Sequence, residues 1–202
     1  MAIRTIFGDI TNRDLIYGDP ESFIIIQQLN CIATKPHGLS EALSKTYPHS
    51  NVYIKRQKID GRNCAILKDR PKPGTIMICK EKGDVSIANL FAQYCYSNSK
   101  NIAYVSQKKY IQNKKNKTND DHQQIEMMEL DNSTGRLGWF KECLIELKEK
   151  LDNDEKIKHV LVPYKIGCNM AGGDWNEYLP ILENFSSTIC QDVTMVVRNS
   201  DM

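Results

Sequence analysis

The stretch of sequence that decides the fold runs Pro163-Tyr164-Lys165-Ile166-Gly167-Cys168-Asn169-Met170-Ala171-Gly172-Gly173-Asp174-Trp175. An apolar run at 160–162 precedes it, and a helix-compatible stretch at 176–185 follows it. The order predicts a strand, a glycine-rich loop and a helix. Glycine permits positive φ and lets a ligand approach backbone N–H groups. The helix N-terminus adds unpaired N–H donors and a positive dipole end, which together suit a phosphate. An ordinary strand-to-helix turn is the alternative interpretation.

The composition is that of a globular protein. The chain has 202 residues, 41% hydrophobic and 26% charged, with a net charge of +2. That length suits one domain spanning residues 1–202, and the small net charge gives no general case for nucleic acid or a membrane surface. Seven cysteines, odd in number and without a C-x-x-C pair, argue against a disulfide scaffold or a zinc site. The N-terminus lacks the apolar stretch of a signal peptide, so we expect a reduced, intracellular protein, cytoplasmic or nuclear.

Apolar runs and turn residues predict the remaining elements. We expect strands at 3–7, 22–29, 64–67, 75–79, 85–91, 102–105, 159–162 and 193–197, and helices at 39–47, 137–151 and 176–185. Strands that alternate with helices imply a layered α/β domain. In such domains ligands bind beyond the carboxyl ends of the strands.

A polar segment interrupts this pattern at about 107–132. Its first part is rich in lysine and asparagine, and almost nothing in 108–124 is apolar. We interpret it as a solvated insertion loop, because such a composition cannot offset the entropy lost on ordering. A basic, aromatic-bearing arm for nucleic acid is the competing interpretation.

A second loop opens into a helix much earlier in the chain. The isoleucine-rich strand at 22–29 ends in the polar residues 27–40, which lead into the predicted helix at 39–47. Two strand-loop-helix units far apart in sequence therefore each offer backbone donors and a helix N-terminus. Two such loops would clamp a diphosphate from opposite sides, which one loop alone cannot do.

Four features together resemble the macro domain family. They are Gly8-Asp9-Ile10-Thr11, the strand ending at Asn30, the turn His37-Gly38-Leu39-Ser40, and the block Pro163 to Trp175. The similarity extends from about Ile3 to Val197, and its nearest branch contains the ADP-ribose-1″-phosphate phosphatases and the terminal ADP-ribose protein glycohydrolase. The resemblance implies a three-layer α/β/α sandwich with a central mixed sheet, which binds ADP-ribose across the sheet.

The resemblance also assigns roles to particular residues. It places Asp9 at the adenine amino group, with the backbone of Ile10 beside it, and Asn30 near the distal ribose. A turn-supporting aspartate and a loop-anchoring asparagine are the alternatives. The resemblance implies two diphosphate loops, whose remaining ligand-binding residues are His37, Gly38, Leu39, Gly167, Cys168, Asn169, Met170, Ala171, Gly172 and Gly173. We interpret Cys168 as a packed loop residue, because no partner base is recognisable in the sequence.

Catalysis is less clearly indicated. Ala171 stands where the glycohydrolases carry a catalytic aspartate, and Gln27 stands where a phosphatase relative carries histidine. Asn169 replaces the usual central glycine of its loop. Asp174 and His37 are the candidate catalytic residues, to activate water; equally, Asp174 suits a helix N-cap and His37 suits a solvated loop.

Three functions follow from these observations. The favoured one is a hydrolase that dephosphorylates ADP-ribose-1″-phosphate or removes ADP-ribosyl groups. The alternative is a non-catalytic reader or sequestering module for ADP-ribose or a related nucleotide. The third is an RNA-associated factor that uses the basic arm. We expect no cofactor, no metal, no membrane contact and a monomer, with ADP-ribosylated protein or nucleic acid as the candidate macromolecular partner.

Overall fold

A six-stranded mixed sheet forms the centre of the protein. The computed structural model describes residues 2–59, 63–95, 115 and 117–198. The strands are β1 (Arg4–Phe7), β2 (Phe23–Asn30), β3 (Ile76–Cys79), β4 (Ser86–Gln93), β5 (His159–Pro163) and β6 (Asp192–Val197), in the spatial order β1-β6-β5-β2-β4-β3. All neighbouring pairs are parallel except β3 with β4. The carboxyl ends of five strands therefore meet at one edge, which we call the C-terminal edge of the sheet.

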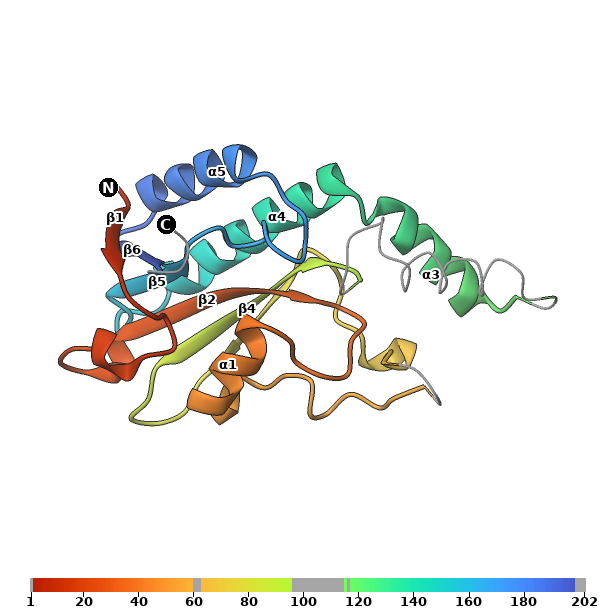
Figure 1. Cartoon of the computed structure of the whole chain (residues 1–202), viewed down its shortest axis with the longest axis horizontal. Helices are drawn as coiled ribbons and strands as arrows, with labels where there is room; N and C mark the ends of the chain where they lie inside the picture. The colour runs from red at the N-terminus through yellow and green to blue at the C-terminus, as the bar shows by residue number, and fades with distance from the viewer. Residues whose placement is uncertain (1, 60–62, 96–114, 116, 199–202) are drawn as a thin grey trace.

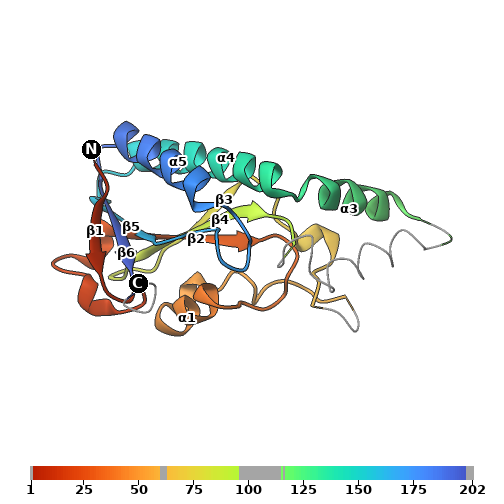
Figure 2. The same cartoon turned by 45° about the horizontal axis from the view of Figure 1, so that its top comes forward.

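Helices cover both faces of this sheet (Figures 1 and 2). α4 (Ser133–Asp152) and α5 (Trp175–Thr188) lie side by side on one face, and α1 (Leu39–Thr46) lies on the other. α3 (Asn119–Leu130) continues from α4 and projects beyond the sheet. Four short 3-10 helices complete the described elements: η1 (Arg13–Leu15), η2 (Pro20–Ser22), η3 (Pro48–Ser50) and η4 (Leu67–Asp69). The predicted three-layer α/β/α sandwich with a mixed sheet is confirmed.

The alternation of side chains along β2 explains the two cores. Ile24 and Ile26 pack with α4 and α5, whereas Phe23 and Ile25 pack with Leu43 of α1. A strand covered on both faces is apolar on both faces, which is why β2 begins with a continuous apolar run instead of an alternating one. A third cluster, which includes Ile32, Tyr53, Phe91 and Met128, lies at the C-terminal ends of β2 and β4.

Three expectations about elements need correction or fall outside the described part. The run at 64–67 is not a strand: it makes a single bridge, Lys58 to Ala65, and then enters η4. The stretch 119–124 is helical, because α3 starts at Asn119 behind a capping box formed by Thr118 and Asp121. The predicted strand at 102–105 lies outside the described residues. None of the helices in the described part is long and apolar enough to cross a membrane.

Candidate functional site

A pocket of about 360 Å³ lies at the C-terminal edge of the sheet. It sits between two loops: loop A (31–38), between β2 and α1, and loop B (164–174), between β5 and α5. The ends of β2, β4, β5 and β6 all contribute to it. The lining residues are Gln28, Leu29, Asn30, His37, Gly38, Leu39, Ser40, Ala42, Tyr53, Gln93, Pro163, Tyr164, Lys165, Ile166, Gly167, Asn169, Met170, Ala171 and Arg198.

Loop A presents the N-terminus of α1 to the pocket. Gly38 is the N-cap residue at φ 57°, and no side chain caps the helix there. Leu39 and Ser40, the first two helical residues, also line the pocket. Backbone N–H groups in the first turn of a helix have no intrahelical acceptor, so they are available to an anion. Asn30 anchors the loop: its Oδ1 accepts a hydrogen bond from the Ala33 N–H at 2.7 Å.

Loop B is folded tightly upon itself. The N–H of Gly173 donates to the carbonyl of Gly167 at 3.0 Å, and the N–H of Gly172 donates to the carbonyl of Asn169 at 2.9 Å. Gly167 and Gly172 have φ values of 76° and 72°, in the region that glycine tolerates without strain. Lys165 holds a φ of 54° as the only non-glycine residue with positive φ among those the structure describes. Loop B is therefore compact, and the left-handed backbone conformation of Lys165 costs it free energy.

Several N–H groups of loop B have no acceptor in the protein. Within the described part of the chain, no hydrogen bond engages the backbone N–H groups of Asn169, Met170 or Ala171. All three residues line the pocket. Unpaired backbone donors that lie beside a helix N-terminus make a site suited to phosphate oxygens.

The charges around the pocket have one sign. No aspartate or glutamate is among the described residues that line it, whereas the cations Lys165 and Arg198 are. Arg198 pairs at 2.8 Å with Asp9, which lies outside the lining. Lys165 and His37 are exposed. Anions concentrate in a cleft of this kind, because cations and N–H dipoles act together in a partly dehydrated space.

The structure brings together most, but not all, of the predicted site residues. The pocket is lined by Asn30, His37, Gly38, Leu39, Gly167, Asn169, Met170 and Ala171. Asp9, Ile10, Cys168, Gly172, Gly173 and Asp174 are not among its described lining residues. The roles assigned to all of these residues stay predictions.

Asp9 supports the turn after β1 and holds a pocket residue. One carboxylate oxygen accepts hydrogen bonds from the N–H and the hydroxyl of Thr11, and the other accepts one from Arg198 at 2.8 Å. Burial alone raises the pKa of the Asp9 carboxyl, but the hydrogen bonds from Thr11 and Arg198 outweigh it and lower the pKa. Asp9 therefore reaches the pocket wall through Arg198. Ile10 is buried beside it.

Asp174 and Cys168 occupy structural positions. Asp174 is the exposed N-cap of α5, and its Oδ1 accepts a hydrogen bond from the Asn176 N–H at 2.9 Å. Cys168 is half-buried, and burial raises the pKa of its thiol to about 11. A thiol with that pKa stays protonated near neutral pH, which fits the interpretation of a packed loop residue.

Several lining residues were not predicted as site residues, and three of them lie outside every element and motif predicted from the sequence: Tyr53, Gln93 and Arg198. Gln93 ends β4 and Arg198 follows β6 directly, so both stand at the carboxyl ends of strands. That position was a usable signal. Tyr53 lies in an irregular segment between η3 and the bridge at Lys58, where nothing in the sequence marks it.

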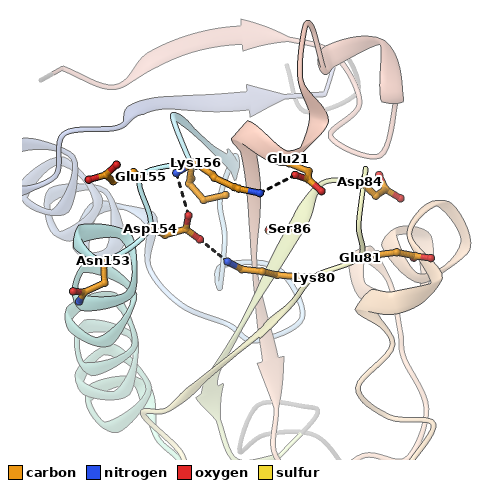
Figure 3. Close-up of a pocket in the computed structure, with 10 residues that line it drawn as sticks. Glu21, Lys80, Glu81, Asp84, Ser86, Asn153, Asp154, Glu155 and Lys156 are labelled. Carbon is orange, nitrogen blue, oxygen red and sulfur yellow. Dashed lines mark hydrogen bonds and ion pairs between the residues drawn. The ribbon is translucent and has the colours of Figure 1, made fainter.

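A second pocket lies at the opposite edge of the sheet, where β2, β4 and β5 begin (Figure 3). Two ion pairs lie within it: Lys80 pairs with Asp154, and Lys156 pairs with Glu21 at 3.2 Å. Glu21 also accepts a hydrogen bond from the Gly83 N–H. Glu81, Asp84 and Glu155 line this pocket too, so its described lining carries five carboxylates against two lysines. Such a lining repels a phosphate, and this pocket is therefore the weaker candidate for an anionic ligand.

One cluster near this second pocket has the composition of a metal site. Ligand atoms of His49, Glu81 and Asp84 lie within 4.8 Å of one another. Both oxygens of Asp84, however, are held by Arg13, at 2.8 and 2.9 Å. A guanidinium cation in that position opposes a second cation, so we interpret the cluster as an ion-pair network. The sequence did not reveal it, because its members come from η3 and the turn between β3 and β4.

Comparisons with known proteins identify the architecture. No protein-family model matches the sequence, and no curated protein matches it. A protein from Bacteroides thetaiotaomicron shares the fold at a TM-score of 0.61 and 20% identity, over 97% of this chain and 99% of that chain. The macrodomain of Mycobacterium tuberculosis DarG gives 0.53 at 18% identity, over 97% of each chain. The macrodomain of Thermus aquaticus DarG gives 0.52 at 12% identity, over 98% of this chain and 97% of that chain. At these identities the likeness shows the fold.

Proposed function

We propose that this chain, which has the macrodomain fold, binds ADP-ribose or an ADP-ribose derivative in the pocket between loops A and B. The observation that carries the proposal is the lining of that pocket. It combines an uncapped helix N-terminus, unpaired N–H groups in loop B and cationic side chains, with no carboxylate among the described lining residues. A diphosphate is the part of ADP-ribose that such a lining favours.

The remainder of the ligand would occupy the two ends of the pocket. Arg198 and its partner Asp9 stand at the β6 end, and Tyr53 and Gln93 stand at the β4 end. A carboxylate is a suitable acceptor for an exocyclic amine, so adenine belongs at the Asp9 end. The ribose distal to it then lies toward Asn30 and loop A.

Hydrolysis of the bound ligand is the finer proposal. Water near the diphosphate needs a group that accepts its proton, and His37 is the only imidazole among the described lining residues. Asp174 lies at the start of α5 and would have to act from outside the lining. A reader without turnover is the second candidate, favoured by the lack of a lining carboxylate.

Isothermal titration with ADP-ribose tests the binding proposal, and release of phosphate from ADP-ribose-1″-phosphate by the same sample tests hydrolysis. We expect binding that weakens as salt is added, because exposed charges contribute to it. Lys165→Met should lower the affinity, while Lys82→Met, on the opposite edge of the sheet, should not. Failure of a folded sample to bind ADP-ribose would refute the proposal. Binding without turnover of that substrate or of an ADP-ribosylated protein would identify a reader.

A further inference from the structure

We propose that two arginines, the buried Arg136 and the half-buried Arg56, are positioning residues that set the shape of loops B and A. Neither side chain is among the described residues that line the pocket. Each instead donates a hydrogen bond to a backbone carbonyl of one loop. The expected effect of these arginines on ligand affinity rests on the proposed function. Their expected effect on the conformation of the loops does not depend on it.

Arg136 connects loop B to the end of β4 through Asp131. Its Nη1 donates to the carbonyl of Ala171 at 2.7 Å, and its Nε and Nη2 donate to the two oxygens of Asp131 at 2.7 and 2.8 Å. The side chains of both partners are almost fully buried, 4% and 0% exposed. Asp131 in turn accepts hydrogen bonds from the N–H groups of Tyr94 and Cys95. Loop B is therefore tied to the sheet by a chain of charge-assisted hydrogen bonds.

Arg56 holds loop A in a similar way. Its Nη1 donates to the carbonyl of Ala33 at 2.7 Å and to that of Asn30 at 3.3 Å. Its guanidinium stacks 4.6 Å from the ring centroid of Tyr53 and 5.7 Å from that of Phe91. Burial lowers the pKa of Arg56, and Tyr53 opposes this effect. The arginine therefore fixes both the loop and the aromatic residue that lines the pocket beside it.

The chemistry of arginine explains why this residue serves both loops. Irregular loops leave buried carbonyl groups that need donors. A planar guanidinium satisfies carbonyls in different directions at once and remains charged, whereas a lysine ammonium is a flexible point charge. Loops that are held in one conformation before the ligand arrives bind it more tightly, because they lose less conformational entropy on binding.

The test is a pair of conservative variants, Arg136→Lys and Arg56→Lys, examined by amide hydrogen exchange without ligand and by ADP-ribose titration. We expect faster exchange confined to 164–174 in the first variant and to 30–38 in the second. We expect Kd to rise about tenfold in each, within the range typical of coupling between separate sites. Arg13→Lys is the matched control, because Arg13 also bonds a carboxylate, Asp84, and a carbonyl, Thr46, but at the opposite edge of the sheet.

The experiment distinguishes a failure of this proposal from a failure of the proposed function. Unchanged exchange in both loops, or faster exchange spread evenly over the chain, would overturn the proposal, because a general loss of stability does not select one loop. If the unaltered protein binds no ADP-ribose, the proposed function fails and the exchange measurement decides this proposal without it. If Arg136→Lys does not fold, Arg56→Lys carries the test, with 164–174 as its internal control.

Discussion

Gly167 lies so close to Tyr178 that a Cβ atom on the glycine would stand 2.6 Å from Cε1 of the ring. The same added atom would stand 2.6 Å from Oε1 of Gln28. Because Gly167 also has a φ of 76°, two independent constraints select glycine at the start of loop B. The ring of Tyr178, in the first turn of α5, therefore packs directly against loop B.

We therefore expect Gly167→Ala to destabilise the protein and to abolish ADP-ribose binding. Positive φ costs a non-glycine residue about 1–2 kcal/mol, and overpacking adds about 1–3 kcal/mol. Chemical denaturation measures the loss of unfolding free energy, and titration measures binding. Gly18→Ala is the matched control: Gly18 has a φ of 72° but no atom within 4 Å of the added Cβ. It should lose only the backbone contribution and keep full affinity; equal losses in the two variants would contradict this explanation.

Asp174 offers a clear separation of a capping role from a catalytic one. As N-cap of α5 it accepts a hydrogen bond from the Asn176 N–H. Replacing it by alanine should lower the free energy of unfolding by about 1 kcal/mol, whereas Asp174→Asn should retain most of the stability. Thermal unfolding together with a turnover assay measures both effects. If Asp174→Asn is fully stable yet loses turnover, the carboxylate has a catalytic role as well.

The ion pair of Arg13 and Asp84 should make stability depend on pH in acid. Burial alone raises the pKa of the Asp84 carboxyl, but hydrogen bonds from Arg13 and from the Val85 N–H outweigh it and lower the pKa. The folded-state pKa then lies below the unfolded value of about 3.9. The stabilisation is complete above that unfolded pKa and is lost as the pH falls through the folded pKa.

We expect the free energy of unfolding to fall less between pH 7 and pH 3 in Asp84→Asn than in the unaltered protein. At pH 7 this variant should be less stable by about 1–2 kcal/mol, since it loses a hydrogen-bonded charge. Urea denaturation at a series of pH values provides the measurement. Arg13→Met should flatten the profile likewise, and Arg4→Met should leave it unchanged. A profile of unaltered slope in Asp84→Asn would refute the assignment.

Cys168 should be a slow nucleophile despite its place in loop B. Its thiol pKa of about 11, raised by burial, leaves almost no thiolate near neutral pH. Alkylation with iodoacetamide followed by mass spectrometry should modify the exposed Cys190 well before Cys168. Cys168→Ala should keep ADP-ribose affinity. Rapid modification of Cys168, or loss of turnover in the alanine variant, would instead indicate a reactive cysteine.

The sequence predicted the sheet and both loops because their signals are local. The apolar run at 23–26, which begins β2, follows from burial on two faces, and the glycines at 167 and 172 follow from positive φ. The run at 64–67 shows where this reasoning fails: Cys64 and Ala65 are buried, but their backbone hydrogen bonds go to Ile59 and to Ile32 of loop A instead of to another strand. An apolar run records burial, not strand pairing.

The contacts that organise the site could not be predicted in the same way. Arg136 and Ala171 are 35 positions apart, and Arg56 reaches back 23 positions to Ala33. Each contact joins a side chain to a backbone carbonyl, a group that every residue carries, so no particular residue type at the receiving end marks it in the sequence. The capping box at Thr118 and Asp121, by contrast, was a readable local signal for the start of α3.

The hydrogen bond between Asp131 and Cys95 affects how the length of the chain between them can change, in evolution or in engineering. The segment 96–130 lies between Cys95 and Asp131. The carboxylate of Asp131 accepts a hydrogen bond from the Cys95 N–H, so the two flanking residues are joined directly. For a segment with fixed ends, each doubling of length adds only about 0.6 kcal/mol of closure cost when the segment is flexible. A change of length between these two ends therefore need not move the sheet or the pocket, provided that Met128 of α3 keeps its place in the third cluster.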